Sequence, residues 1–504
     1  MSHQDAYVKE DRLNADCLNE AFLWLFKGID WSAIQFRIDC GWMPATFAAM
    51  ALLFAWSSEP TLIDRFRSSL KIIEFLFPEE RRSKPKAKKG QSKKRKESKH
   101  KRPSVSYQAF VKMLRTWTAT YVALFQAELR RRMPALFPDL LMICGFIVFG
   151  CDGSRVDLAR TRSNEKAYAP SRKKNSGQTA RMRRKAKKSA RNRRRLLAKQ
   201  KHSRKADVPQ IWVTLMFHLG TRLPWDWRLG PSDSSERAHL LEMLLALPQR
   251  SFIAADAGFV GYEYLSAIHQ SGRSLLIRVG SNVRLLKQLG YFKESGNTVY
   301  LWPDHAASKK LPPLVLRLVV ANNGKHPVYL VTNVLSQKRL TNAQVITIYS
   351  KRWGIEVHYR HFKQTFQKRK LRSHNSENAR VELEWSLLAL WIMLLYALVE
   401  VRKSGADPSK LSCAETWREI RNTMRDYRHP VESGERLRQR LKSAVTDDYI
   451  RKDKTSRNYP RKKQETPAGA PKIHLATKSQ IKRAKELSME RRSKGLRAIP
   501  FNES

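Results

Sequence analysis

The stretch ICGFIVFGCDGS, residues 143–154, is the point at which this sequence changes from helical to α/β character. Its apolar run Ile143–Phe149 predicts a buried strand, and Gly150–Ser154 predicts a turn at the end of that strand. A second run, Ser251–Ala255, leads in the same way into the tetrapeptide DAGF that begins at Asp256. Ligands and metals bind at the carboxyl ends of buried strands in α/β folds. Asp152 and Asp256 are therefore candidate site residues, although Asp-Gly is also common in ordinary turns.

Further apolar runs of strand length follow on the carboxyl side of Asp152. They are Ile211–Leu219, Leu275–Val279, Thr298–Trp302, Leu314–Val320 and Val328–Val334. No helical pattern separates the later runs, so residues 275–340 are predicted to be mainly β.

A strong helix is predicted over residues 341–367, TNAQVITIYSKRWGIEVHYRHFKQTFQ, with Thr341 and Gln344 in capping-box positions. Tyr349, Arg352, Glu356 and Lys363 fall within roughly 60° of arc on one face of an ideal helix. If Glu356 held a metal ion, Arg352 and Lys363 would be placed to bind phosphates on either side of it. The alternative is an ordinary basic helix in which Glu356 forms surface ion pairs one turn away.

Two aspartates at strand ends and a glutamate on a helix are a suitable ligand set for hard cations such as Mg²⁺. Two such ions can activate a water or a 3′-hydroxyl and stabilise the leaving oxygen of a phosphoryl transfer. Asp152, Asp256 and Glu356 are the candidates for this role. Four other acids are not excluded by chemistry alone: Asp157, Asp226, Asp233 and Glu236.

The charge of the chain indicates a polyanionic partner. Its 504 residues contain 97 Lys plus Arg against 45 Asp plus Glu, a net charge of +52. Nucleic acid is the expected partner, because each neutralised phosphate releases a counterion and strengthens binding. Two basic blocks, residues 81–102 and 171–205, carry +29 of this charge. Neither block can bury much apolar surface, so both are predicted to be flexible segments.

Other patterns exclude several classes of protein. The five cysteines are scattered without a CxxC pair, which argues against a zinc site or a disulfide framework. The N-terminus lacks the apolar core of a signal peptide. Two apolar runs, Trp42–Trp56 and Trp385–Val399, have 15 residues each, short of the ~18 of a bilayer span, and are predicted to be buried helices. No GxxxxGK[ST] loop is present, so no nucleotide cofactor is expected.

The spacing Tyr349-x₂-Arg352-x₃-Glu356-x₆-Lys363 resembles the Tyr-Arg-Glu-Lys signature of the insertion-sequence-4 group of DDE transposases. The segment Cys151–Arg155 is similar to that family's Asp-Gly-Thr/Ser motif, and Ala255–Phe259 is similar to its Asp-x-Gly-Phe/Tyr motif. The three motifs occur in the family's order, and the resemblance covers about residues 140–400.

This resemblance implies an activity and roles for individual residues. It implies that Asp152, Asp256 and Glu356 are the catalytic acids and hold two Mg²⁺ or Mn²⁺ ions. It implies that Tyr349, Arg352 and Lys363 contact transposon-end DNA near the scissile phosphate. In this family an aromatic residue of the insertion can stack on a flipped base, and Trp302 is the candidate here. A Trp in a strand is, however, more often a packing residue.

The resemblance also implies an α/β fold, with an RNase H-like mixed-sheet core at residues 140–402. Residues 171–205 would then be a basic insertion and 275–340 a β-rich insertion. Residues 1–80 are expected to form a helical region for end recognition or dimerisation, 81–102 a linker, and 103–139 a helical connector. Residues 403–504 are expected to be basic and loosely ordered at the end.

A DNA transposase of an insertion sequence is therefore the leading hypothesis. Its expected partners are double-stranded DNA, as terminal inverted repeats and as target, and a second copy of the chain on DNA. A cytoplasmic, nucleoid-associated location in a prokaryote is expected, without a membrane. Two alternatives remain: an inactive or repurposed transposase that binds DNA, and a metal-dependent nuclease without strand transfer.

Overall fold

The structure of this protein is a computed structural model. It describes residues 13–37, 40–77, 106–170, 194, 208–322, 326–428, 436–446 and 469–496. The predicted flexible block 81–102 lies outside these residues, and so does 171–205 apart from Arg194.

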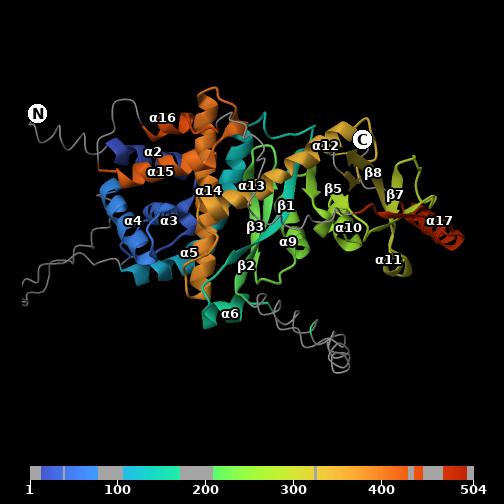
Figure 1. Cartoon of the computed structure of the whole chain (residues 1–504), viewed down its shortest axis with the longest axis horizontal. Helices are drawn as coiled ribbons and strands as arrows, with labels where there is room; N and C mark the ends of the chain where they lie inside the picture. Colours follow the sequence, from blue (N-terminus) through green and yellow to red (C-terminus); the bar gives the residue numbers. More distant parts are fainter. Residues whose placement is uncertain are drawn as a thin grey trace, which may run out of the picture.

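A group of helices forms one end of the molecule (Figure 1). From the first part of the chain come α2 (Leu13–Phe26), α3 (Pro44–Trp56), α4 (Leu62–Leu76) and α5 (Tyr107–Leu136), with a 3₁₀ turn at Trp31–Ala33. The C-terminal part adds α15 (Cys413–Arg425) and α16 (Leu437–Lys442). Helix α3 begins with Pro44 at its first position and is buried over most of its length. The predicted buried helix at Trp42–Trp56 is thus confirmed.

Helix α14 (Ser376–Lys403) stands between this helical group and the sheet (Figure 1). It is long and apolar enough to cross a membrane, but its apolar window is wholly buried inside the protein. Toward the helices, Trp385 Nε1 donates to Thr118 Oγ1 at 2.9 Å, and Trp56 Nε1 donates to the Ala389 carbonyl at 3.0 Å. Toward the sheet, the Trp391 and Trp227 ring centroids are 6.2 Å apart. The prediction of a buried core helix at Trp385–Val399 is confirmed.

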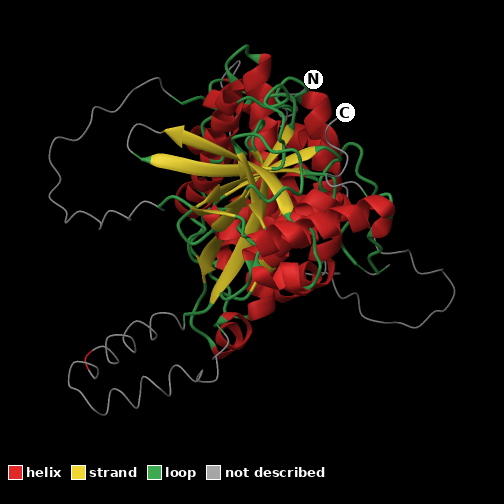
Figure 2. Ribbon diagram, turned by 90° about the vertical axis from the view of Figure 1, so that its right-hand side faces the viewer, coloured by secondary structure: helices red, strands yellow, loops and turns green. Residues whose placement is uncertain are grey.

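The strands form a single mixed sheet of ten, which twists across the molecule (Figure 2). They are β1 (Ile147–Asp157), β2 (Gln210–His218), β3 (Leu223–Gly230), β4 (Ser251–Ala255), β5 (Ser274–Val279), β6 (Arg284–Lys287), β7 (Thr298–Leu301), β8 (Leu314–Asn322), β9 (Pro327–Thr332) and β10 (Lys472–Leu475). The order is β10-β6-β7-β8-β9-β5-β4-β1-β2-β3. Strand β1 pairs antiparallel with β2 and parallel with β4, and β4 pairs parallel with β5.

Shorter helices lie along the sheet or in its connections. They are α6 (Arg162–Tyr168), α9 (Glu236–Met243), α10 (Tyr262–Gln270), α11 (Asp304–Ser308), α12 (Asn342–Lys351), α13 (Trp353–Arg360) and α17 (Lys478–Ser493). The 3₁₀ turns are Leu244–Ala246, Ala257–Phe259 and Pro408–Lys410, and a π-helical segment, η4, spans His361–Thr365. The capping box predicted at Thr341 and Gln344 is confirmed at the start of α12.

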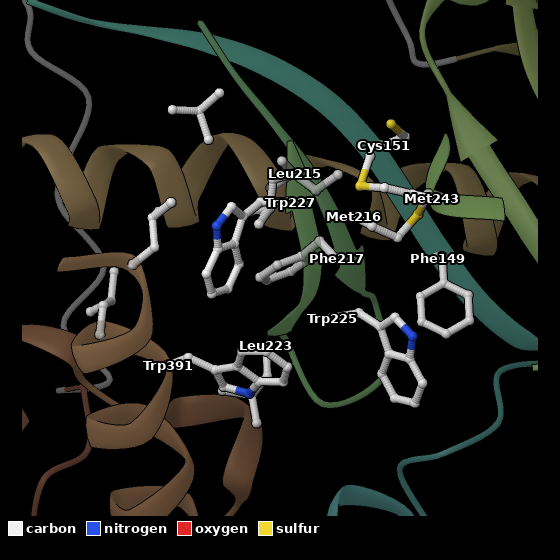
Figure 3. Close-up of a cluster of buried hydrophobic side chains, with 14 of the residues drawn as sticks. Phe149, Cys151, Leu215, Met216, Phe217, Leu223, Trp225, Trp227, Met243 and Trp391 are labelled. Atoms are coloured by element: carbon white, nitrogen blue, oxygen red, sulfur yellow. The ribbon is translucent and has the colours of Figure 1, made fainter. Parts of the chain in front are cut away.

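A cluster of large apolar side chains joins the sheet to its helices (Figure 3). Its labelled members come from β1, β2, β3, α9 and α14: Phe149, Cys151, Leu215, Met216, Phe217, Leu223, Trp225, Trp227, Met243 and Trp391. All of them are buried. This packing holds β1 rigidly against its neighbours, and β1 carries the first candidate aspartate.

Several predictions about local structure were wrong. Strand β1 does not turn at Gly150–Ser154 but runs on to Asp157, because β2 pairs with it along its whole second half. The predicted helix 341–367 is instead α12, α13 and the π-helical segment in succession. The prediction that residues 275–340 are mainly β is confirmed, and strands β6–β9 continue the central sheet through the β5–β9 pairing. Within the expected loose C-terminal end, residues 472–493 form β10, which pairs with β6, and α17.

Helix α13 packs closely on β1 at Gly150, and this contact gives a stability prediction. A Cβ at Gly150 would lie 2.5 Å from Ile355 Cδ1 and 3.0 Å from Leu219 Cδ2. We therefore expect Gly150→Ala to lower the free energy of unfolding by about 1–3 kcal/mol in urea denaturation, because the buried core must shift. Ile355→Val removes the Cδ1 atom, so the double variant should lose less than the sum of the single losses. Strictly additive losses would contradict this contact.

Candidate active site

The parallel register of β1 and β4 brings the two candidate aspartates together. Cys151 of β1 lies opposite Ala255 of β4, and Asp152 and Asp256 are the next residues along the two chains. Side chains at equivalent positions of neighbouring strands point to the same face of a sheet. The third strand follows the same register, since Ala255 lies opposite Ile277 and Arg278 comes next. Arg278 Nη1 lies 3.9 Å from Asp256 Oδ1.

Local hydrogen bonds fix the backbone at Asp256, where β4 ends. Its Oδ1 accepts a hydrogen bond of 2.7 Å from the backbone N–H of Ala257 and caps the 3₁₀ turn Ala257–Phe259. About half of the Asp256 side chain (45%) remains exposed. Its second carboxylate oxygen therefore has access to solvent and to a ligand.

Helix α13 carries Glu356 and is held on β1 by specific contacts. Besides Ile355 over Gly150, the Tyr359 hydroxyl is 3.0 Å from both the Asp152 and the Val213 carbonyl oxygens. Tyr359 lies one turn beyond Glu356 in this helix. The helix that carries the third candidate acid is thus fixed directly over the backbone of the first.

Arg352 is the central cation of the site. It is 8% exposed, and its Nη2 donates to Glu356 Oε1 at 3.0 Å. Its guanidinium carbon lies 5.5 Å from the centroid of the Tyr349 ring. The ion pair between Arg352 and Glu356 is the one that the alternative interpretation of this helix predicted. The structure places it in a half-buried site beside Asp152 and Asp256 and not on an ordinary solvated face.

Lys363 reaches β1 from the π-helical segment. Its Nζ donates to Ser154 Oγ at 2.6 Å, and Ser154 lies two residues after Asp152, on the same face of the strand. Burial lowers the pKa of Lys363, and the charges of Asp157 and Asp152 partly oppose this. Four of the residues selected from the sequence, Tyr349, Arg352, Glu356 and Lys363, are thus arranged over β1 and the end of β4.

The surroundings of Asp152 disfavour its ionised form. Burial raises the pKa of Asp152 from 3.8 to about 6, and the negative charges of Glu356 and Asp256 add to the increase. A hydrogen bond from the Gly153 backbone and the charge of Arg352 oppose it. Carboxylates whose ionised forms disfavour one another are typical of sites that receive a cation.

A fourth acid lies next to this cluster. Among the four further acids, Glu236 at the first position of α9 approaches Gly153, where an added Cβ would lie 2.7 Å from its Cγ and Oε1. Burial and the charge of Asp152 raise the pKa of Glu236 to about 6. The sequence around it, a serine cap followed by a glutamate, is common at helix starts. No local signal therefore separated Glu236 from other acids.

The other three acids have different surroundings. Asp226 is buried and forms ion pairs with Arg130 at 3.2 Å and Arg228 at 3.0 Å. Asp157 accepts a hydrogen bond of 2.6 Å from Gln210 Nε2. Asp233 is exposed at the surface.

The structure corrects the expectation for Trp302. Its side chain is 4% exposed, and its Nε1 donates to the Leu311 carbonyl at 2.8 Å. A ring that stacks on a flipped base needs a free face, and the Trp302 ring is buried in packing against the core instead. Trp302 is therefore a packing residue in this structure and is not proposed as a DNA contact.

The carboxylates suit a divalent metal ion in kind. All are hard oxygen ligands of the type that Mg²⁺ and Mn²⁺ prefer. They come from two neighbouring strands and a facing helix, and burial, together with the charges of Glu356 and Asp256, raises the pKa of Asp152. Within the described residues no three His, Cys, Asp or Glu side chains are already spaced to hold an ion. Glu356 would have to leave Arg352 to complete such a set.

Comparison with known proteins gives a match to one protein family. Residues 151–392 match the family model of the transposase DDE domain. This segment of the chain is thus similar to the DDE domain of transposases. The matched segment begins one residue before Asp152 and includes Asp256 and Glu356.

A curated relative is the transposase InsG for insertion sequence element IS4 of Escherichia coli (strain K12), which is 24% identical over 219 residues. The match covers 41% of this chain and 49% of that protein, so the chain matches about half of the relative's length. A solved structure, a piggyBac transposase synaptic complex with hairpin DNA, aligns over 90% of this chain and 87% of that chain, with 12% identity. Its TM-score of 0.38 does not establish a common fold.

The raised pKa of Asp152 gives a pH-dependent prediction. The folded protein binds this proton more tightly than the unfolded chain does, so the contribution of Asp152 to stability is lost as the pH rises from about 4 through 6. Asp152→Asn removes this penalty. In EDTA at pH 8 we expect the variant to be more stable to urea than the wild type, by up to about 3 kcal/mol.

The difference should vanish near pH 4, where both proteins are neutral at this position. Asp304→Asn, at an exposed acid of α11, is the control and should show no such pH-dependent gain. A variant less stable than the wild type at pH 8 would show that the Asp152 carboxylate is not destabilised by its surroundings.

Proposed function

We propose that this protein is the DNA transposase of an insertion sequence, which cleaves transposon ends and transfers the 3′-hydroxyl to target DNA. The observation that carries the proposal is the register that sets Asp152 beside Asp256, under the helix that carries Glu356. The match of residues 151–392 to the transposase DDE domain supports it independently.

In this proposal Asp152, Asp256 and Glu356 are the catalytic acids and hold two Mg²⁺ or Mn²⁺ ions. When bound, these ions would activate the attacking oxygen and stabilise the leaving oxygen of an in-line phosphoryl transfer. Arg352 and Lys363 lie on either side of Glu356 and would bind the phosphates that flank the cut. Release of Glu356 from Arg352 would free the guanidinium for phosphate at the moment when the carboxylate turns to metal.

Tyr349 is proposed to contact the transposon end together with these cations. Its ring packs against Arg352, and its hydroxyl is buried without a hydrogen-bond partner among the described residues. A buried hydroxyl of this kind is costly unless a ligand satisfies it. DNA near the scissile phosphate would supply such a partner.

The wider architecture is assigned by the same proposal. Five strands of the sheet lie in the order β3-β2-β1-β4-β5, and β2 runs antiparallel to the other four. This arrangement supports an RNase H-like core at residues 140–402. Residues 1–80 would serve end recognition or dimerisation. The protein would act as a homodimer on double-stranded DNA, in the nucleoid of a prokaryotic cell, where its net charge of +52 would favour binding.

Two other functions share parts of this chemistry. An inactive or repurposed transposase would bind DNA without cutting it. A metal-dependent nuclease would cut DNA without joining the 3′-hydroxyl to a target. The products separate these functions, because only a transposase forms new joints between donor and target DNA.

The proposal is tested by excision and joining of a marker placed between the DNA ends that flank the reading frame. Glu356→Gln keeps the size of the side chain and removes the charge that would hold metal. We expect excision to fall by at least about 100-fold, since losing a ligand should cost no less than losing its supporting contacts. New joints in target DNA should disappear with it.

Glu415→Gln is a closely matched control. Glu415 is 34% exposed and pairs with Arg418 at 2.8 Å within a helix, while Glu356 is 33% exposed and pairs with Arg352 at 3.0 Å. Excision by Glu415→Gln should equal that of the wild type. Equal excision by Glu356→Gln would exclude Glu356 as a catalytic acid, and cutting without joints by the wild type would favour the nuclease.

A further inference from the structure

An open groove lies between α4 and α15 in the helical group. It has a volume of about 750 Å³. Each of its two helices carries a row of cations along it: Arg67 and Lys71 on α4, and Arg418, Arg421 and Arg425 on α15. Residues three or four apart on a helix lie on the same side of it, at successive turns. The groove therefore presents cations at intervals, as a linear polyanion requires.

The groove has a positive net charge. Among the described residues, two acids line it beside the five cations, Glu59 and Asp64, which leaves a net charge of +3. Three of the cations form ion pairs of 2.8–3.7 Å with acids near them in the sequence. Lys71 and Arg421 form no ion pair with an acid that the structure describes. Their charges are available to a ligand.

The groove also contains a hydrogen-bond donor that lacks an acceptor. Trp417 lines the groove and is 6% exposed. Its Nε1 is buried and has no hydrogen-bond partner among the described residues. The guanidinium carbon of Arg421 lies 5.5 Å from the centroid of the Trp417 ring. Because a buried N–H is costly without an acceptor, an anion drawn to Arg421 would also satisfy the indole.

This groove adjoins the segment that carries Lys363. Thr365, two residues after Lys363 in η4, lines the groove. The ring centroids of Phe366, at the end of η4, and Trp417 are 4.3 Å apart, so α15 packs directly against this end. A polyanion bound near Lys363 would thus reach the groove by passing the end of η4.

We propose that the groove binds the phosphodiester backbone of double-stranded DNA that extends from the candidate active site. The inference rests on the proposed function, because it assigns a second contact to the same DNA substrate. Lys71 and Arg421 bind backbone phosphates, and Trp417 Nε1 donates a hydrogen bond to a phosphate oxygen. Such contacts position DNA without reading its sequence.

A simpler role for these cations is to keep the surface charged and the protein soluble. They would then affect DNA binding only through the net charge of the protein, and removal of two cations elsewhere would have the same effect. A direct phosphate contact differs, because each one releases counterions and steepens the dependence of binding on salt.

The test measures the affinity of the full-length protein for a duplex of the transposon end, by fluorescence anisotropy in EDTA at several KCl concentrations. We expect Lys71→Gln/Arg421→Gln to reduce the slope of log affinity against log salt by about 2, since each phosphate contact contributes about 0.9. Lys482→Gln/Arg483→Gln is the matched control. It removes the same charges from α17, at the other end of the molecule (Figure 1), and should keep the wild-type slope.

Trp417→Phe provides a second variant, which keeps an aromatic ring and removes the donor. We expect it to bind the duplex about 10-fold more weakly, because a hydrogen bond to a charged group is lost. Its salt slope should equal that of the wild type, because the indole carries no charge. Circular dichroism should first establish that this variant folds, since Trp417 is buried.

The outcomes distinguish this inference from the proposed function. Equal slopes in Lys71→Gln/Arg421→Gln and the α17 control, with wild-type affinity in Trp417→Phe, would overturn the groove as a DNA contact while the duplex is still bound. A reduced slope in the groove variant, with no new joints formed by the wild type in the marker assay, would support the groove and overturn the transposase function.

Discussion

The parallel register of β1 and β4 is the constraint on which the candidate site depends. With Cys151 opposite Ala255, Asp152 and Asp256 become neighbours on one face of the sheet. A shift of one residue would send one of the two side chains to the opposite face, because the side chains of a strand alternate. The buried side chains of Phe149 and Cys151 pack on the other face of β1 and hold that register (Figure 3). The packing of the core on one face of β1 therefore determines the geometry of the site on the other face.

The second requirement is a helix placed directly over this register. Gly150 permits the close approach of α13, and the Tyr359 hydroxyl ties α13 to the Asp152 carbonyl. The result brings negative charges together in a half-buried place, where Arg352 is the main cation that compensates them. Such an arrangement sacrifices stability at neutral pH for the ability to receive cations and phosphates. The surrounding ten-stranded sheet and the buried helix α14 supply the rigidity that maintains it.

Local sequence patterns allowed many helices and strands to be predicted. Features that depend on long-range contacts could not be predicted from such patterns. Strand β4 was predicted with its observed bounds, and α5 lies within the predicted helical connector at residues 103–139, because caps and apolar runs are local signals. The pairing of β2 with the far half of β1 is non-local, and so the predicted strand was wrongly ended at Phe149. Glu236 was left undistinguished because its position beside Gly153 arises from how α9 packs on β1. Trp302 was misassigned because burial of a strand side chain depends on which face meets the core.

We expect Asp152, Asp256 and Glu356 to close around metal ions when transposon-end DNA is bound. Anomalous X-ray diffraction from crystals of the protein with Mn²⁺ and a terminal DNA duplex tests it most directly. The account predicts manganese peaks within coordination distance of all three carboxylates, with Glu356 released from Arg352. Peaks elsewhere, or a retained ion pair between Arg352 and Glu356 beside bound metal, would contradict it.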